Sequence, residues 1–322
     1  MKPGRSCPLH YRYSPEDLAR DTVFNADCLY VVGGLYGNLP ALETILELAA
    51  HEPQPVRIVF NGDFNWFNVD PAGLADINRR VLEHTALRGN VETELACDDS
   101  AAGCGCGYPE FVSDIEVERS NHIMEALRNT ARAFPDLRRQ LGALPMHAAV
   151  QVDSIRIAIV HGDCESLAGW GLSSEARADA DHHARVQRWF AQTGARVIAS
   201  SHSCLPVMLK VDTTRGACVA INNGAAGMPN FHGTRYGVIT RIARRPSEQV
   251  QPLYTARIDG VHVEALPVHY DHERWQRDFL TNWPAGSSAH DSYYSRITQG
   301  PGYTVDEATG QTALAAQAEQ GY

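Results

Sequence analysis

The stretch Val56-Arg57-Ile58-Val59-Phe60-Asn61-Gly62-Asp63 gives the clearest indication of the fold. Its apolar run, Val56 to Phe60, predicts a buried strand, which Asn61-Gly62 ends directly before an acidic side chain. Upstream, residues 28–32 form another short apolar run, and residues 39–50 carry apolar side chains at helical spacing. Strands that alternate with helices in this way are typical of an α/β fold with a largely parallel sheet.

The alternation continues downstream to about residue 215. Further helices are expected over residues 71–82, 112–134 and 174–192, and further strands over residues 85–88, 155–160 and 196–199. Beyond that point the pattern changes to short strands at residues 216–221, 236–243, 251–258 and 261–267. Asp259-Gly260 joins the last two and predicts a type I′ hairpin turn.

Composition narrows the class of protein. The chain has 322 residues, of which 44% are hydrophobic and 20% charged, so it can bury a sizeable core. The net charge of -10 argues against a general nucleic-acid binder but leaves room for a small phosphorylated substrate at a local site. The N-terminus lacks the apolar segment of a secretory signal, and no run is long enough to span a membrane. We therefore expect a cytoplasmic protein without membrane contact, in which most of the eight cysteines are free thiols.

Four side chains that can bind metal follow predicted strands: Asp63, Asn90, His161 and His202. Each one alone is more often part of a turn or a hydrogen-bonded core residue. Together they suggest a shared site, because the carboxyl ends of parallel strands meet at one edge of a sheet. One carboxylate, one amide oxygen and two imidazoles suit zinc, manganese or iron.

In their order along the chain, these residues resemble the motifs of the calcineurin-like metallophosphoesterase superfamily, nearest its small bacterial phosphatase and phosphodiesterase branch. The resemblance covers about residues 28–270, and it implies an α/β sandwich of two mixed β-sheets flanked by helices. The segments that carry it are Gly34-Leu35-Tyr36-Gly37-Asn38, Asn61-Gly62-Asp63, Gly89-Asn90-Val91-Glu92, Val160-His161-Gly162-Asp163, Ser201-His202-Ser203-Cys204 and Asn222-Asn223-Gly224-Ala225.

The resemblance implies that one of the family's two metal ions is retained, held by Asp63, Asn90, His161 and His202. The private ligands of the other ion are replaced by Gly34, Tyr36 and Cys204, so a second metal is doubtful. Tyr36 and Cys204 either rebuild that site, as phenolate and thiolate ligands, or simply fill its space, and we favour the second. Val91 stands where the family has a histidine that is a candidate general acid.

We therefore expect a metal-dependent hydrolase of phosphomonoesters or phosphodiesters that uses a metal-activated water. The resemblance assigns catalysis to Asp63, Asn90 and His161, and the substrate pocket is expected to include Asn38, Trp66 and Glu92. Two alternatives remain open. One is a catalytically degenerate protein that binds phosphate, a nucleotide or a partner. The other is a thiol-based redox protein that uses Cys104, Cys106 or Cys204.

The chain is expected to divide into an N-terminal extension (residues 1–27), a metallophosphoesterase domain (residues 28–290) and a flexible tail (residues 291–322). Within the domain, residues 28–215 are expected to build the first sheet and residues 216–270 to contribute to the second. The small-residue segment 97–109 is expected to be a flexible loop near the mouth of the site.

Overall fold

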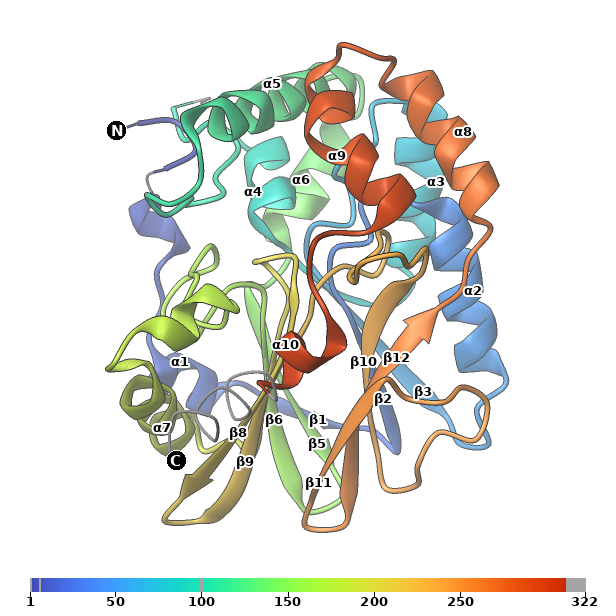
Figure 1. Cartoon of the computed structure of the whole chain (residues 1–322). Coiled ribbons are helices and arrows are strands. Elements are labelled where there is room, and N and C mark those ends of the chain that lie inside the picture. The colour runs from blue at the N-terminus through green and yellow to red at the C-terminus, as the bar shows by residue number, and fades with distance from the viewer. Residues whose placement is uncertain (1, 6, 99–100, 311–322) are drawn as a thin grey trace, which may run out of the picture.

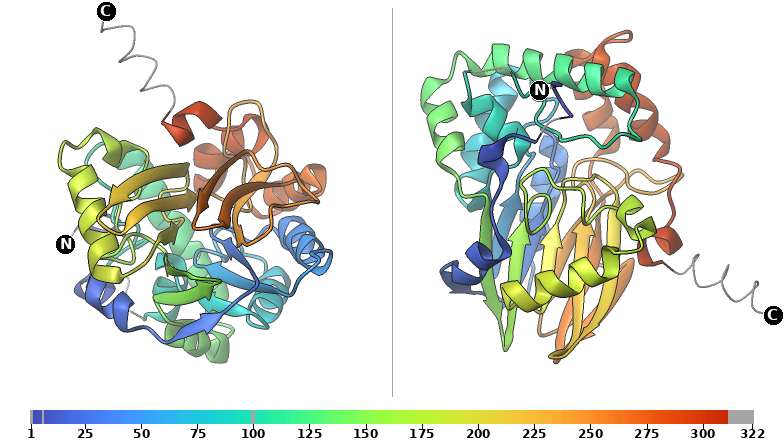
Figure 2. Two further views of the ribbon diagram at one scale, coloured as in Figure 1. Left: turned by 90° about the horizontal axis from the view of Figure 1, so that it is seen from below. Right: turned by 90° about the vertical axis from the view of Figure 1, so that its left-hand side faces the viewer.

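The computed structural model describes residues 2–5, 7–98 and 101–310, and it contains two six-stranded sheets with helices on their outer faces (Figure 1). Two further views show the strands of both sheets running side by side, with most helices gathered above one end of the sandwich (Figure 2). This arrangement confirms the predicted α/β sandwich of two mixed sheets. None of the described helices is long and apolar enough to cross a bilayer.

The first sheet has the strand order β1-β5-β6-β7-β9-β8. In it, β1 runs parallel to β5, and β6, β7 and β9 are parallel to one another. Strand β5 pairs antiparallel with β6, and β8 pairs antiparallel with β9. The strands are β1 (Val23–Asn25), β5 (His147–Val152), β6 (Ile155–Val160), β7 (Val197–Ser200), β8 (Pro206–Thr213) and β9 (Gly216–Asn223).

The second sheet has the order β11-β12-β10-β2-β3-β4. Its three N-terminal strands are parallel, and its three C-terminal strands are antiparallel to their neighbours. The strands are β2 (Cys28–Val32), β3 (Val56–Asn61), β4 (Thr85–Leu87), β10 (Gly237–Ala243), β11 (Tyr254–Ile258) and β12 (Val261–Val268). Asp259 and Gly260 between β11 and β12 both have positive φ, as the predicted type I′ turn requires.

The division of strands between the sheets differs from the expectation that residues 28–215 build one sheet and residues 216–270 the other. Strand β2 pairs with β10, with Tyr30 opposite Arg241, and β9 lies between β7 and β8 in the other sheet. All five residues of β2 are buried, so this strand has to be central and needs a partner at each edge. Strand β3 covers one edge, and only a distant strand can cover the other.

Three apolar layers hold the elements together. One lies between the sheets, a second between the second sheet and the helices that cover it, and a third between the first sheet and α1 with α7. The helices are α1 (Pro15–Arg20), α2 (Leu39–Ala50), α3 (Pro71–Val81), α4 (Asn90–Ala96), α5 (Asp114–Ala131), α6 (Pro135–Ala143), α7 (His182–Thr193), α8 (His272–Asn282), α9 (Ser288–Gln299) and α10 (Val305–Thr309), with short 3-10 turns η1 (Leu9–Tyr11) and η2 (Glu175–Ala178).

The helix expected over residues 174–192 is interrupted. It consists of η2 and α7, separated by a turn at Asp179 to Asp181. The Asp179 carboxylate accepts a hydrogen bond from the Asp181 backbone N–H and pairs with Arg185. Such a side-chain bond to the following backbone competes with helical hydrogen bonding, which explains the break.

Both ends of the described chain pack onto the sandwich. At the N-terminus, expected as an extension, β1 adds a strand to the first sheet and α1 contacts α7. Residues 291–310, expected as part of a flexible tail, differ from that expectation because they form helices with buried Ile297, Tyr303 and Ala308. The Tyr303 hydroxyl also donates to the Pro206 carbonyl at 2.8 Å. The rest of the predicted tail, residues 311–322, lies outside the described residues.

Candidate metal centre

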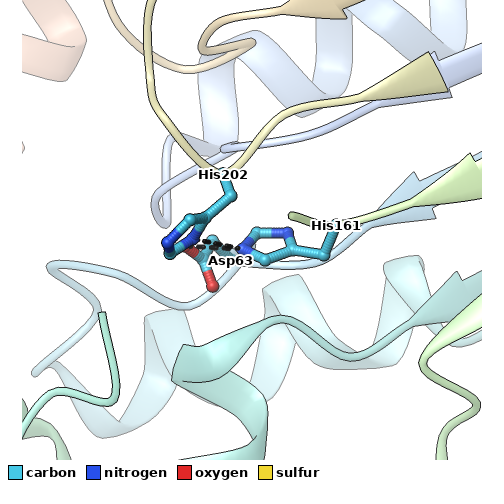
Figure 3. Close-up of side chains that lie close together, drawn as sticks. All are labelled: Asp63, His161 and His202. Atoms are coloured by element: carbon cyan, nitrogen blue, oxygen red, sulfur yellow. Dashed lines mark hydrogen bonds and ion pairs between the residues drawn. The ribbon is translucent and has the colours of Figure 1, made fainter. Parts of the chain in front are cut away.

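The four predicted donors lie at one end of the sandwich, each directly after a strand. Asp63 follows β3 and Asn90 follows β4 in the second sheet, whereas His161 follows β6 and His202 follows β7 in the first sheet. Each sheet therefore supplies two donors. Figure 3 shows Asp63, His161 and His202 pointing toward one another from separate loops.

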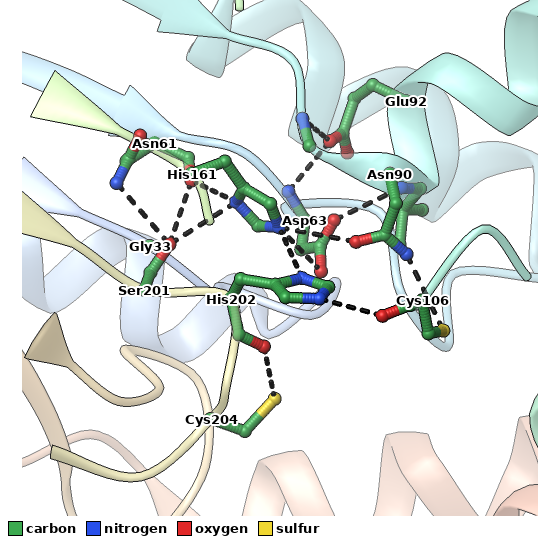
Figure 4. A network of polar contacts seen from close by, with 12 residues as sticks. Gly33, Asn61, Asp63, Asn90, Glu92, Cys106, His161, Ser201, His202 and Cys204 are labelled. Atoms are coloured by element: carbon green, nitrogen blue, oxygen red, sulfur yellow. Dashed lines mark hydrogen bonds and ion pairs between the residues drawn. The ribbon is translucent and has the colours of Figure 1, made fainter. Parts of the chain in front are cut away.

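The donor atoms are close enough to share an ion. One ligand atom each from Asp63, His161 and His202 lies within 4.8 Å of the other two. The Nε2 atom of His161 is 3.3 Å from Asp63 Oδ2, 3.3 Å from Asn90 Oδ1 and 3.2 Å from His202 Nδ1 (Figure 4). All four side chains are buried. A carboxylate oxygen, an amide oxygen and two imidazole nitrogens around one point fit a borderline divalent cation.

Backbone carbonyls fix the orientation of the two imidazoles and the amide. His161 Nδ1 donates to the Asn61 carbonyl at 2.7 Å, which leaves Nε2 as the donor atom for a metal. His202 Nε2 donates to the Cys106 carbonyl at 2.9 Å, which leaves Nδ1 facing His161. Asn90 Nδ2 donates to the Cys104 carbonyl at 2.9 Å, so that Oδ1 faces the same point. All three side chains are thereby oriented as ligands.

The turn that carries Asp63 depends on Gly62. Both residues have positive φ, and a Cβ atom at Gly62 would lie 2.6 Å from His161 Nδ1. Only glycine allows the strand end to approach the histidine this closely. The Asp63 carboxylate is held in turn by the Val91 backbone N–H, at 3.1 Å from Oδ1.

Glu92, predicted as a pocket residue, instead holds the two turns that carry Asp63 and Asn90. Its carboxylate accepts hydrogen bonds from the backbone N–H groups of Asp63 at 2.7 Å and Gly89 at 3.0 Å, and from both nitrogens of Asn65. Burial, followed by the charge of Asp63, raises the pKa of Glu92 to about 7. Glu92 therefore fixes the backbone of the two turns that carry the ligands Asp63 and Asn90.

The pKa values of the two histidines in the donor set are shifted in opposite directions. Burial opposes protonation of His161, but the Asp63 carboxylate outweighs it and raises the pKa of His161 above its ordinary value. Burial, with the nearby His161, lowers the pKa of His202 to about 4. Burial favours the protonated form of Asp63, but the two imidazoles outweigh this effect and keep the pKa of Asp63 below its ordinary range. His161 is therefore the imidazole at which a proton competes most strongly with a metal ion.

Tyr36 and Cys204, which the resemblance places at the family's other metal position, are in contact with each other. Tyr36 Oη lies 2.8 Å from Cys204 Sγ, and a Cβ atom at Gly34 would lie 2.9 Å from that same hydroxyl. The tyrosine ring therefore covers Gly34. Burial raises the pKa of both Tyr36 and Cys204, which disfavours the phenolate and thiolate forms that bind metal. These contacts support the interpretation that the pair fills the space.

The donor set opens into a cavity of about 40 Å³. Trp66 lines it as predicted, whereas Asn38 and Glu92 do not. The lining residues are Tyr36, Asp63, Trp66, Asn90, Val91, Cys106, Tyr108, Trp170, His202, Cys204 and Tyr293. Asn38 is fully buried at the start of α2, where it accepts from the Ala41 N–H and donates to the Gly227 carbonyl. A wider cleft of about 1130 Å³ beside β8 and α10 contains none of the four donors.

Several cavity residues were missed by sequence reasoning. Tyr108, Trp170 and Tyr293 lie in loops or on α9, and none of them follows a strand in a recognisable motif, whereas Cys106 was considered as a redox thiol and not as a lining residue. Aromatic residues in such segments carry no local signal that points to a site. Only the mixture of small residues and cysteines in residues 97–109 suggested a loop at the mouth.

The loop that holds Asn90 and His202 in place contains a Cys104–Cys106 disulfide. The other six cysteines are free, in agreement with the expectation that most of the eight are thiols, and the described residues contain no other disulfide. Gly103, Gly105 and Gly107 all have positive φ, which folds the loop tightly and brings the two sulfurs together. The loop is thus a rigid support whose carbonyls orient two of the four donors.

Comparison with known proteins agrees with this site. Residues 21–238 match the family described as calcineurin-like phosphoesterase, which is more than half of the chain. The chain therefore belongs to the calcineurin-like phosphoesterase family. This membership supports a metal-dependent hydrolase that acts on phosphate esters.

Two solved structures show the same fold. A metallophosphoesterase from Sphaerobacter thermophilus is similar with a TM-score of 0.54 and 16% identity, covering 85% of this chain and 100% of its own. A hypothetical protein from Pyrococcus horikoshii OT3 is similar with a TM-score of 0.51 and 16% identity, covering 87% of this chain and 100% of its own. The search of curated proteins found no match.

Proposed function

We propose that this chain hydrolyses small phosphate esters with a single metal ion held by Asp63, Asn90, His161 and His202. The observation that carries the proposal is the convergence of these four buried donors from the ends of four strands. A manganese, zinc or iron ion bound there would supply a Lewis acid that polarises the phosphoryl group and activates water.

The residues of the chain contribute position and exclusion of water. Carbonyls of Asn61, Cys104 and Cys106 keep three donors in one orientation, so little reorganisation accompanies binding. The cavity is small and largely apolar, with Trp66 and Tyr293 on its walls, and it confines a phosphoryl group beside Asp63. Of the proposed catalytic residues, Asp63 and Asn90 line the cavity, and His161 contacts both of them through Nε2 at 3.3 Å.

The test combines elemental analysis of the purified protein with hydrolysis of nitrophenyl phosphate esters in the presence of manganese, zinc or iron. The His161→Ala variant is expected to lose bound metal and activity together. The matched control is His183→Ala, because His183 is exposed on α7 away from the donors. If wild-type protein loaded with metal hydrolyses no ester, or if His161→Ala is as active as wild type, the proposal fails.

A second candidate is a protein that binds a phosphate ester without turnover. The Tyr36–Cys204 pair favours this candidate, because it stands where the resemblance places a second metal ion. With one metal ion, the attacking and leaving oxygens are not both stabilised by a metal. In that case phosphate esters would raise the melting temperature of the metal-loaded protein while no product accumulated.

A further inference from the structure

A row of aromatic rings runs from the donor set to the surface. The ring of Trp170 lies 5.5 Å from that of His202 in an edge-to-face arrangement. Tyr108 lies 5.9 Å and Phe111 6.0 Å from Trp170, and Phe111 is 61% exposed. We call Tyr108, Phe111 and Trp170 the aromatic wall.

The aromatic wall is anchored to the same loop that orients the donors. Trp170 Nε1 donates to the Cys106 carbonyl at 3.1 Å, and that carbonyl also accepts from His202. The indole therefore holds a fixed position beside the metal centre. Because the cavity has room for only a few water-sized groups, the organic part of an ester has to lie outside it, against this wall.

The charges around the cavity limit the phosphate that it can accept. Among the described lining residues there is no lysine or arginine, and Asp63 adds a negative charge. A nearby guanidinium, that of Arg296, is engaged with the carbonyls of Cys204 and Pro229 behind the cavity. A phosphomonoester dianion or a polyphosphate carries two or more negative charges, which one metal ion and this lining cannot neutralise. A phosphodiester carries only one negative charge.

The lining residues that the structure describes also include no ready proton donor for the leaving group. Val91 has no titratable side chain and Cys106 is part of the disulfide, so the hydroxyls and the free thiol that face the cavity belong to Tyr36, Tyr108, Tyr293 and Cys204. Tyr36 Oη and Cys204 Sγ are engaged with each other at 2.8 Å, and burial raises the pKa of Tyr108 and Tyr293, so these two are poor acids at neutral pH. A leaving group that is stable as an anion suits such a site.

We propose that the substrate of this site is a phosphodiester whose retained ester group, the one that stays on phosphorus, carries a planar aromatic ring that packs against the aromatic wall. This inference rests on the hydrolase activity proposed above. In the reaction, the oxygen of water bonds to phosphorus and the bond between phosphorus and one ester oxygen breaks. That oxygen leaves with the electron pair as an alkoxide or aryloxide and is protonated by solvent. One proton of the attacking water passes to solvent and offsets the proton taken up by the leaving oxygen. The other stays on the second product, a phosphomonoester, until that product ionises.

The experiment compares four esters that release the same chromophore, p-nitrophenolate, so that they differ only in the group that stays on phosphorus. They are p-nitrophenyl phosphate, methyl p-nitrophenyl phosphate, bis(p-nitrophenyl) phosphate and thymidine 5′-p-nitrophenyl phosphate. We expect the two diesters with a second aromatic group to have kcat/KM about tenfold or more above the methyl diester and the monoester. The nitrophenyl and thymidine arms distinguish a general aryl preference from a nucleobase preference.

Phe111→Ala tests the aromatic wall directly, because Phe111 is exposed and its loss is compatible with folding. We expect the variant to raise KM for the two aromatic diesters about fivefold and to leave the methyl diester unchanged. Ile115→Ala, which removes another exposed apolar side chain on α5, is the matched control. Calorimetric binding of diphenyl phosphate, expected to weaken in Phe111→Ala and not in Ile115→Ala, provides a readout independent of turnover.

The outcomes separate the two proposals. Equal or faster hydrolysis of the monoester or the methyl diester, or an unchanged KM in Phe111→Ala, overturns the substrate inference and leaves the hydrolase standing. No hydrolysis of any of the four esters by metal-loaded protein overturns the hydrolase and the substrate inference together.

Discussion

His161 is the residue on which proton and metal ion compete. Its Nε2 atom faces Asp63, Asn90 and His202, and its Nδ1–H is held by the Asn61 carbonyl. Without a metal, Asp63 raises the pKa of His161 above the ordinary value of 6.5. The protonated imidazole then pairs with Asp63 and takes the place of a cation.

The first prediction concerns pH. The His161–Asp63 pair stabilises the metal-free protein fully below about pH 6.5, and this contribution is lost as pH rises through the raised pKa of His161. Because a metal needs unprotonated Nε2, metal affinity is expected to increase over that same window. Competition titrations with a chromophoric chelator across about pH 5 to 9 measure this dependence. An affinity that does not change over that range would contradict the prediction.

The second prediction concerns the position of the family's other metal. If Tyr36 and Cys204 only fill space, the double variant Tyr36→Phe/Cys204→Ser keeps the same metal content as wild type, and His202→Ala loses it. Elemental analysis of the three proteins, prepared side by side, provides the counts. A wild-type protein with more metal than the double variant would show that the tyrosine and cysteine are ligands.

At the scale of the elements, α2 is held at its start by Asn38. Its Oδ1 accepts from Ala41 N–H and its Nδ2 donates to the Gly227 carbonyl, both at 2.9 Å, so it joins the helix to the turn before β10. The third prediction is that Asn38→Ala lowers the free energy of unfolding by about 2 kcal/mol, since it removes a helix cap and leaves the buried Gly227 carbonyl with only the long contact from the Tyr270 hydroxyl at 3.5 Å. Asp70→Ala, which removes only the exposed cap of α3, is expected to cost about 1 kcal/mol.

Chemical denaturation measures both variants, and their activities provide the control. Since Asn38 does not line the cavity, kcat for a phosphodiester is expected to stay at the wild-type value in Asn38→Ala. A large loss of kcat with unchanged stability would return Asn38 to the substrate pocket in which the sequence placed it.

Strand β10 carries a buried ion pair that joins it to its surroundings. Arg241 contacts Glu52 at 2.6 Å and Glu264 at 2.7 Å, and all three side chains are buried. The fourth prediction is that Arg241→Met destabilises the protein by about 3–5 kcal/mol, because two carboxylates lose their buried partner. Arg257→Met on the exposed face of β11 is the control, with little expected change. Thermal unfolding compares them, and equal stability of the two variants would refute the argument.

For the whole molecule, the donor set acts as a link between the two sheets. Asp63 and Asn90 follow strands of one sheet, with Asn90 as the first residue of α4, and His161 and His202 follow strands of the other. The fifth prediction is that chelation lowers the melting temperature and speeds amide exchange at the ends of β3, β4, β6 and β7 together. At a metal concentration of about 100 times Kd, binding contributes about 2.7 kcal/mol to stability.

The control for this link is His161→Ala, whose melting temperature is expected not to respond to metal or chelator. Hydrogen exchange followed by mass spectrometry localises the change. If chelation increased exchange at the ends of only one sheet, the metal would not join the two sheets and the proposed ligand set would be wrong.

The sequence alone determined what depends on short stretches of chain. Buried strands such as Val56 to Asn61, the Asp259-Gly260 turn and the order of the four strand-end donors are local patterns, so they could be read without the fold. Within each sheet two donors lie close together because the ends of neighbouring parallel strands share an edge. The packing of the two sheets, whose division of strands the sequence did not predict, brings the two pairs together.

Only the tertiary structure decided the features that depend on distant contacts. The pairing of β2 with β10, the role of Asn38 in joining α2 to the Gly227 turn, and the aromatic wall around Trp170 all bring together residues far apart in sequence. Each contact is selected because it covers a buried edge, satisfies a buried polar group or closes a cavity. These conditions exist only once the two sheets are packed, and no single segment carries them.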